Sequence, residues 1–174
     1  GFDTHGDPIV EKSADLILVD MDGSISIAAS ELKFPNGTVI TNNGKTLVVA
    51  ETRGRCLTAF DIASDGSLSN RRVWAALGDH VPDGICLDAE GLIWLADPAN
   101  SCVLRVREGG EIAERLDFSQ RTYACALGGD DGRTLCVCTA AGSGPVARSQ
   151  RSGRIETVRV ATPCFTSTLD PHGS

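Results

Sequence analysis

Two related stretches of the sequence carry oxygen-bearing side chains at matching positions. One contains Pro35-Asn36-Gly37 and the other contains Pro82-Asp83-Gly84, and each is followed by a short apolar run, a Gly turn and a second apolar run. Amide and carboxylate oxygens are the ligands that a hard cation such as calcium takes in proteins. Asn-Gly and Asp-Gly are also common turn dipeptides, so a purely structural role for Asn36 and Asp83 is the alternative interpretation.

The turns of the chain recur with a regular period. Gly23, Gly66 and Gly110 form one series, and Gly44, Gly91 and Gly132 form a second series with a similar spacing of 41 to 47 residues. The segments between them are short, and their residues either alternate between apolar and polar or are continuously apolar. Each segment ends in Gly, Asp or Asn, a pattern that is typical of strands. Periods of this length built only from short strands are typical of propeller blades, so we expect no amphipathic helix.

The period predicts one complete four-stranded unit over 38–77 and a second over 85–118. A third unit runs from 123 to 160 with a Gly/Ser/Ala-rich insertion at 140–153, and residues 14–27 supply only the outer half of a first unit. We therefore predict an all-β chain, a single domain over residues 1–174, that forms about three and a half to four blades of a six-bladed β-propeller. An open arc leaves its end blades uncovered, so we expect missing blades or another chain to close the propeller.

Composition restricts the possible partners. The chain has a net charge of −7 and a pI near 4.9 without a cluster of Lys and Arg, which argues against a nucleic-acid partner. No apolar run reaches the roughly 18 residues that a membrane helix requires, so we expect no membrane partner.

The cysteines and histidines do not form a recognisable ligand pattern. Seven cysteines, an odd number, are scattered through the apolar strands, which favours buried free thiols in a reducing cytoplasm. Cys136 and Cys138 share a strand face but lack a partner His pair, which makes a zinc site there improbable. His5, His80 and His172 are far apart in the sequence, and we expect them to be exposed loop residues.

The predicted inner strands bring the polar residues together. Innermost strands of a propeller begin at the central channel, so Asn36 and Asp83 should converge on its axis. Alignment of the repeats on Val39, Cys86 and Cys125 places Thr122 in the same position, which makes Thr122 a candidate substrate-binding residue.

Motifs distributed over nearly the whole chain carry a family resemblance. Together they resemble the C-terminal portion of the family of gluconolactonase, regucalcin (senescence marker protein) and luciferin-regenerating enzyme. The motifs are Phe34-Pro35-Asn36-Gly37, Gly44-Lys45-Thr46-Leu47-Val48-Val49-Ala50-Glu51, Ser69-Asn70-Arg71-Arg72-Val73, Pro82-Asp83-Gly84, Asp88-Ala89-Glu90-Gly91-Leu92-Ile93-Trp94, Cys125-Ala126-Leu127-Gly128-Gly129 and Ser152-Gly153-Arg154-Ile155-Glu156.

The resemblance implies a six-bladed propeller that hydrolyses sugar lactones or related small esters with one divalent cation at its centre. Calcium is the first choice of ion, with zinc, manganese or magnesium as alternatives. Asn36 and Asp83 match the family's metal ligands, and Asp83 is also the candidate catalytic base. The family's further Glu ligand and its upstream Arg and Asn have no counterpart here, so we expect the sequence to start late. A non-catalytic binding propeller and an inactive fragment are the alternatives.

Overall fold

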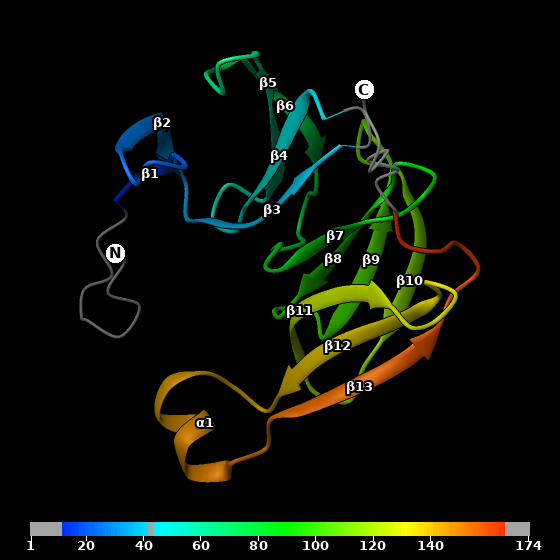
Figure 1. Ribbon diagram of the computed structural model, residues 1–174. Helices are drawn as coiled ribbons and strands as arrows, with labels where there is room; N and C mark the ends of the chain where they lie inside the picture. Colours follow the sequence, from blue (N-terminus) through cyan, green and yellow to red (C-terminus); the bar gives the residue numbers. More distant parts are fainter. Residues whose placement is uncertain (1–11, 42–43, 166–174) are drawn as a thin grey trace.

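Short antiparallel strands dominate the computed structural model, which describes residues 12–41 and 44–165. They form four small sheets that follow one another in sequence order around an arc (Figure 1). The first sheet pairs β1 (Ala14–Val19) with β2 (Ile25–Leu32). The second has the order β3 (Pro35–Ile40), β4 (Thr46–Glu51), β5 (Cys56–Ile62), β6 (Leu68–Ala76). The third has the order β7 (Ile85–Leu87), β8 (Ile93–Asp97), β9 (Cys102–Val106), β10 (Ile112–Asp117), and the fourth has the order β11 (Arg121–Gly128), β12 (Thr134–Ala140), β13 (Arg154–Arg159).

This architecture agrees with the predicted all-β class and with the predicted strand positions. The predicted units over 38–77 and 85–118 correspond to the two four-stranded sheets, and the incomplete first unit is present as the two-stranded β1–β2 sheet. The number of blades in a closed propeller stays a prediction.

The predicted turn glycines have the backbone conformation that their turns require. Their φ angles lie between 70° and 99°, in the region that only glycine enters without strain. These residues are Gly23, Gly44, Gly66, Gly91, Gly110 and Gly132.

The insertion contains one short helix, which is not amphipathic and therefore does not contradict the expectation of no amphipathic helix. Residues Gly144–Gln150 form α1, a seven-residue helix between β12 and β13 with Pro145 in its first turn and no buried residue. Pro is favoured at this position because its fixed φ suits the helix and its missing N–H has no partner there anyway. A helix with no buried side chain has no apolar stripe, which is why the sequence pattern did not predict it. Among the described residues, none of the helices has the length and apolar character needed to cross a membrane.

The hydrophobic core lies in layers between consecutive sheets. Leu32, Val49 and Phe60 fill the layer between the first and second sheets, and Trp94 belongs to the layer between the third and fourth sheets. The largest layer joins the second and third sheets and contains, among others, Val48, Ala50, Leu57, Trp74, Ile85, Ile93, Leu95 and Leu104. In β8 the neighbours Ile93 and Trp94 enter different layers, because successive side chains of a strand point to opposite faces.

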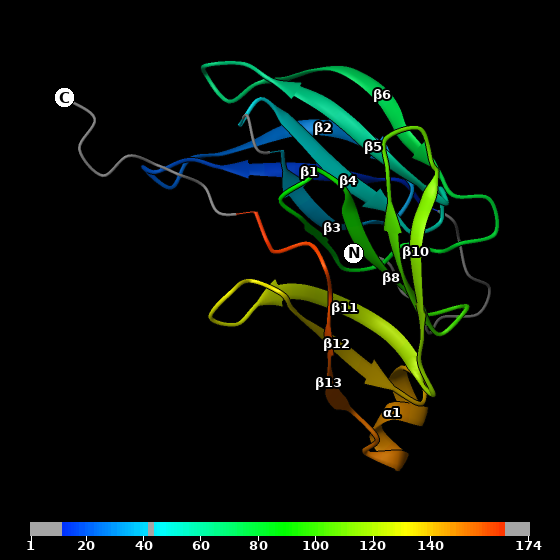
Figure 2. The same cartoon turned by 90° about the vertical axis from the view of Figure 1, so that its right-hand side faces the viewer.

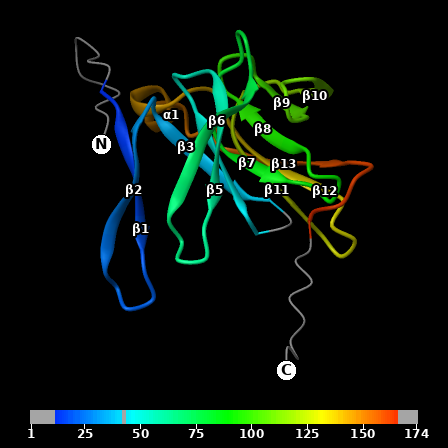
Figure 3. The same ribbon diagram turned by 90° about the horizontal axis from the view of Figure 1, so that it is seen from above.

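The two ends of the arc have open faces. On the first sheet Ile17 pairs with Ile27 and Val19 with Ile25, and all four side chains are exposed. On the fourth sheet Ile155 is exposed in the same way. Figure 3 shows the first sheet at the left edge of the molecule, and Figure 2 shows the fourth sheet at the bottom.

Candidate metal and active site

The inner strands of neighbouring sheets are joined by backbone hydrogen bonds at the positions of the candidate ligands. Asn36 lies in β3, and Asp83 lies two residues before β7, which contacts both β3 and β11. The N–H of Asp83 donates to the carbonyl of Ala96 in its own sheet (2.9 Å), and its carbonyl accepts from the N–H of Gly37 in the second sheet (3.1 Å). The backbone of Asp83 is therefore held from both sides.

Gly37 and Gly84 allow this close approach. A Cβ atom at Gly37 would lie 2.6 Å from the backbone N of Ile85, and one at Gly84 would lie 2.7 Å from Cα of Ala124. Neither glycine has a positive φ. Asn36-Gly37 lies within β3 and not in a turn, and both glycines serve the packing of one inner strand against the next. Whether Asn36 and Asp83 are ligands or have a purely structural role stays a prediction.

The side chains of Asn36 and Asp83 meet across this junction. The Asn36 amide lies close enough to the Asp83 carboxyl to lower its pKa, and Nδ2 of Asn36 donates to Oγ1 of Thr52 (3.3 Å). The Thr52 hydroxyl in turn donates to the carbonyl of Pro82 (2.7 Å). Thr52 thus fixes Asn36 relative to the segment that carries Asp83. The sequence pattern gave no signal for Thr52, because it lies in the irregular turn after β4.

Partial burial changes the acidity of Asp83. Desolvation raises the pKa of its carboxyl from 3.8 to about 6, and the hydrogen bond from Asn36 acts in the opposite direction. The carboxylate is half-buried, and Asn36 is exposed. Asp83 therefore titrates close to neutral pH.

Thr122 occupies a different kind of position from Asn36 and Asp83. It is 0% exposed, and its hydroxyl donates to the carbonyl of Cys102 (2.6 Å) and accepts from the N–H of Asp97 (3.1 Å). These contacts favour a structural role over the predicted substrate contact.

Tyr123 is the residue in register with the candidate ligands. The N–H of Gly84 donates to the carbonyl of Tyr123 (3.0 Å), just as the N–H of Gly37 donates to that of Asp83. The one-residue difference from the sequence alignment arises from a register irregularity between Thr122 and Ala124 in β11. The hydroxyl of Tyr123 is buried and has no hydrogen-bond partner among the described residues.

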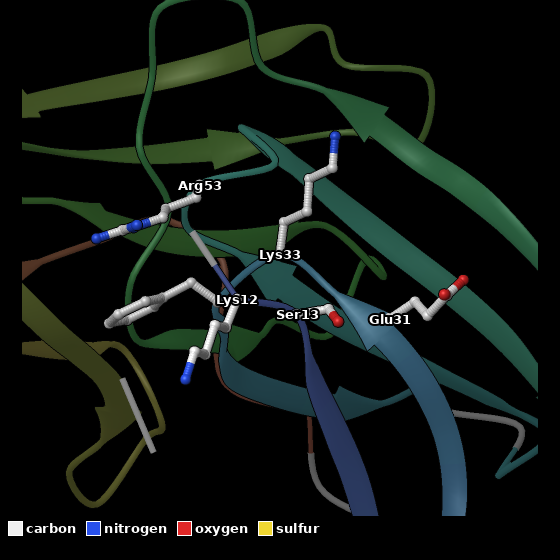
Figure 4. Close-up of a pocket in the computed structure, with 6 residues that line it drawn as sticks. Lys12, Ser13, Glu31, Lys33 and Arg53 are labelled. Atoms are coloured by element: carbon white, nitrogen blue, oxygen red, sulfur yellow. The ribbon is translucent and has the colours of Figure 1, made fainter. Parts of the chain in front are cut away.

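A hollow of about 380 Å³ flanks the Asn36 side of the junction, between residues 12–13 and the segments around β3 and Arg53. Figure 4 shows Lys12 and Lys33 extending to opposite sides and Glu31 pointing away from both. The charged groups diverge, so the hollow does not present one converged set of ligand-binding groups. It is lined by Lys12, Ser13, Glu31, Lys33, Phe34 and Arg53.

The chain is similar in sequence to a known protein family. Residues 2–141 match the sequence profile of the family described as the SMP-30/Gluconolactonase/LRE-like region. The chain belongs to this family. The pentonolactonase of Haloferax volcanii is 30% identical over 135 residues, which cover 74% of this chain and 46% of that protein. Regucalcin of Xenopus laevis is 28% identical over 138 residues, which cover 76% and 46%. The chain therefore spans about half the length of these curated family members.

Solved structures of family members have the same fold. Luciferin-regenerating enzyme superposes with a TM-score of 0.80 at 20% identity and covers 93% of this chain and 57% of its own. A gluconolactonase of Xanthomonas campestris superposes with a TM-score of 0.63 at 26% identity and covers 73% of this chain and 42% of its own.

The donor set at the junction fits a hard divalent cation. The Asn36 amide and the Asp83 carboxylate offer one neutral and one anionic oxygen from adjacent inner strands. Calcium takes roughly 6–8 oxygen ligands, so two protein donors leave most positions to water, substrate or other protein groups.

Proposed function

We propose that the chain is part of a metal-dependent hydrolase of sugar lactones or related small esters. The observation that carries this proposal is the contact between the Asn36 and Asp83 side chains, whose strands are joined by the hydrogen bond from Gly37 to Asp83. Family members named as pentonolactonase and 6-deoxy-6-sulfogluconolactonase support lactones as the substrate class. Asn36 and Asp83 are the proposed ligands of one divalent cation.

When bound, a divalent cation at these oxygens supplies a Lewis acid for the lactone carbonyl and lowers the pKa of a coordinated water. Calcium is the first choice because both donors are oxygens, and zinc, manganese or magnesium are the alternatives.

Asp83 is also the proposed general base. A catalytic base works best when its pKa lies near the operating pH, and partial burial raises the pKa of this carboxyl to about 6. The carboxylate then accepts a proton from the water that attacks the ester carbonyl. Asn36 lies beside this carboxyl and lowers its pKa, and Thr52 positions Asn36 by accepting a hydrogen bond from Nδ2.

The wider setting follows from the same proposal. The seven cysteines are free thiols, which fits a reducing compartment such as the cytoplasm. We also propose that additional blades or another chain close the propeller around the small-molecule lactone.

The test measures lactone opening with a pH indicator and ion binding by calorimetry, using aldonolactones with added calcium, manganese, zinc or magnesium. We expect Asp83→Ala to abolish both ion binding and hydrolysis, with hydrolysis falling by at least ~10²-fold. Asn36→Ala should weaken both less, because a neutral amide contributes less to holding a cation. A chelator should reproduce the effect of Asp83→Ala.

The matched control is Asp130→Ala, which removes an exposed turn carboxylate and should change neither property. Unchanged ion affinity in Asp83→Ala would return that residue to a structural role. Ion binding without any turnover would favour the non-catalytic propeller instead.

A further inference from the structure

A second group of metal-binding side chains lies on the third sheet. Antiparallel pairing sets Asp97 of β8 directly opposite Cys102 of β9, so their side chains share one face of the sheet. His80 reaches this face from the segment before β7. One ligand atom from each of the three residues lies within 4.8 Å of the others. The prediction that His80 is an exposed loop residue is wrong, since its side chain is only 18% exposed.

The Asp97 carboxylate is unusually placed for a charged group. It is 0% exposed, as is Cys102. Its Oδ2 lies 2.7 Å from Nδ1 of His80 and accepts from Nδ2 of Asn100 (2.7 Å). Its Oδ1 accepts the N–H groups of Ala99 (3.0 Å) and Asn100 (3.2 Å). Among the described residues, its ion pair is with His80, which is a cation only when protonated. Burial of a carboxylate is costly unless hydrogen bonds and a positive partner compensate it, and the hydrogen bonds that Asp97 accepts from Ala99 and Asn100 come from neutral groups.

The second sheet provides an internal comparison. Glu51 of β4 lies opposite Cys56 of β5, in the same arrangement as Asp97 and Cys102. Glu51 is also buried, but Nη2 of Arg71 lies 3.1 Å from its carboxylate and supplies a permanent charge. Within residues 12–41 and 44–165, no arginine pairs with Asp97 in this way.

Arg115 of β10 acts on this face without pairing with Asp97. Its positive charge interacts with Cys102 and Asp97, but its guanidinium forms an ion pair with Asp117 at 2.8 Å. A cysteine lies opposite the acidic residue in both sheets, and the place that Arg71 has beside Glu51 is taken beside Asp97 by the imidazole of His80.

We propose that His80, Asp97 and Cys102 bind a divalent transition-metal ion of the zinc class. Zinc is commonly held by imidazole nitrogen, carboxylate oxygen and thiolate sulfur, with three protein ligands leaving one open position. The donor set differs from the two oxygens of Asn36 and Asp83, which suit a harder ion such as calcium. The site is thus distinct from the proposed lactonase centre.

Binding exchanges protons for the metal. In the free protein burial, assisted by the negative charge of Asp97, raises the pKa of the Cys102 thiol to about 11, so the thiol is neutral. The incoming ion displaces the thiol proton to solvent. Before binding, the neutral imidazole of His80 carries its proton on Nδ1, toward Asp97. When Nδ1 binds the metal, this proton is lost from Nδ1 and the imidazole is protonated on Nε2 instead, so it stays neutral. One metal–sulfur, one metal–nitrogen and one metal–oxygen bond form.

The site lies on the segment that leads to Asp83. His80 is three residues before Asp83, and both residues belong to the connection into β7. A bound metal ties this connection to β8 and β9. It therefore stabilises the backbone that carries the proposed catalytic carboxylate.

The experiment titrates the purified chain with cobalt(II), which substitutes for zinc and gives a near-ultraviolet charge-transfer band when a thiolate is bound. We expect the wild type to show this band and zinc to remove it by competition. Cys102→Ser should abolish the band. Cys56→Ser and Cys86→Ser should retain it, since Cys56 has Arg71 beside its carboxylate partner and Cys86 lies outside the cluster.

A second variant guards against misfolding. His80→Gln alters a partly exposed side chain and should lose the tight cobalt complex while circular dichroism stays unchanged. Asp83→Asn should retain the cobalt band even where it loses calcium binding and lactone hydrolysis, so the two proposals fail separately. A band that survives in Cys102→Ser, or no cobalt binding by the wild type, would overturn the site.

Discussion

Cation binding and partial burial favour opposite charge states of the Asp83 side chain. Its carboxylate is proposed to hold a cation, yet burial stabilises the protonated form relative to water and raises the pKa of the half-buried group to about 6. In cation-free buffer its contribution to stability is complete below the ordinary pKa of 3.8. This contribution is lost as pH rises through about 6, because the folded state binds the proton more tightly than the unfolded state.

We therefore expect urea unfolding of the cation-free chain to lose stability between pH 4 and pH 6 relative to Asp83→Asn, whose amide does not titrate. The free energy of unfolding is measured for both proteins over this range. Parallel curves for the two proteins would contradict the raised pKa. Saturating calcium should reduce the difference, since the ion favours the charged form.

Gly84 provides a test of the strand junction that does not alter any charge. An Ala at this position would place Cβ 2.7 Å from Cα and 2.9 Å from Cβ of Ala124, so one inner strand would have to move. We expect Gly84→Ala to destabilise the fold by ~1–3 kcal/mol in urea unfolding and to weaken cation binding. Gly128→Ala is the matched control, because its Cβ would meet nothing within 4 Å and its φ is not positive. Equal stability of the two variants would contradict the close-packing argument.

At the scale of elements, Arg105 links several segments around one end of the third sheet. Its Nε donates to Oδ2 of the buried Asp88 (2.7 Å), and its two Nη atoms reach Glu114 of β10, Glu90 of the β7–β8 turn, and Thr162. Arg105 itself is buried. Its removal would leave the carboxylate of Asp88 inside the protein without a cation.

We expect Arg105→Ala to destabilise the chain by ~3–5 kcal/mol, because breaking a buried ion pair leaves an uncompensated charge. Arg107→Ala, which breaks the exposed pair with Glu111, should cost no more than ~1 kcal/mol. Thermal and urea unfolding of both variants check the difference. Similar losses in the two variants would show that Arg105 contributes little beyond a surface pair.

The elements also show where sequence reasoning succeeds and where it stops. Strand positions follow from alternating apolar residues and positive-φ glycines such as Gly66 and Gly91, because both signals are local. The irregularity between Thr122 and Ala124 depends on pairing with β12, so alignment on Cys125 placed Thr122 one residue from the true register. The meeting of Asn36 with Asp83 was predictable from the repeat. The cluster around Asp97 was not, because strand pairing and a loop bring its members together.

At the scale of the whole molecule, the open face of the first sheet is the main liability. Ile17, Val19, Ile25 and Ile27 form an exposed apolar patch on two paired strands. Such faces promote association with other chains. We expect the chain on its own to associate as its concentration rises, as measured by sedimentation velocity.

Replacing the paired residues Val19 and Ile25 by Lys should reduce this association without loss of strand content. Val146→Lys, on the exposed surface of α1, is the control and should leave the association unchanged. A wild-type chain that sediments as a single monomer at every concentration would show that the open faces need no cover.

The hydrogen bond between the N–H of Gly37 and the carbonyl of Asp83 links the packing of two sheets to the geometry of the candidate site. The spacing between the second and third sheets is also the spacing between the two candidate ligands, so a core substitution that widens one widens the other. Amino-acid substitutions in the core layer between these sheets are therefore selected for both folding and activity. Substitutions in layers farther from the junction are selected for folding alone. This asymmetry predicts slower divergence of the central layer than of the outer ones wherever the activity is maintained.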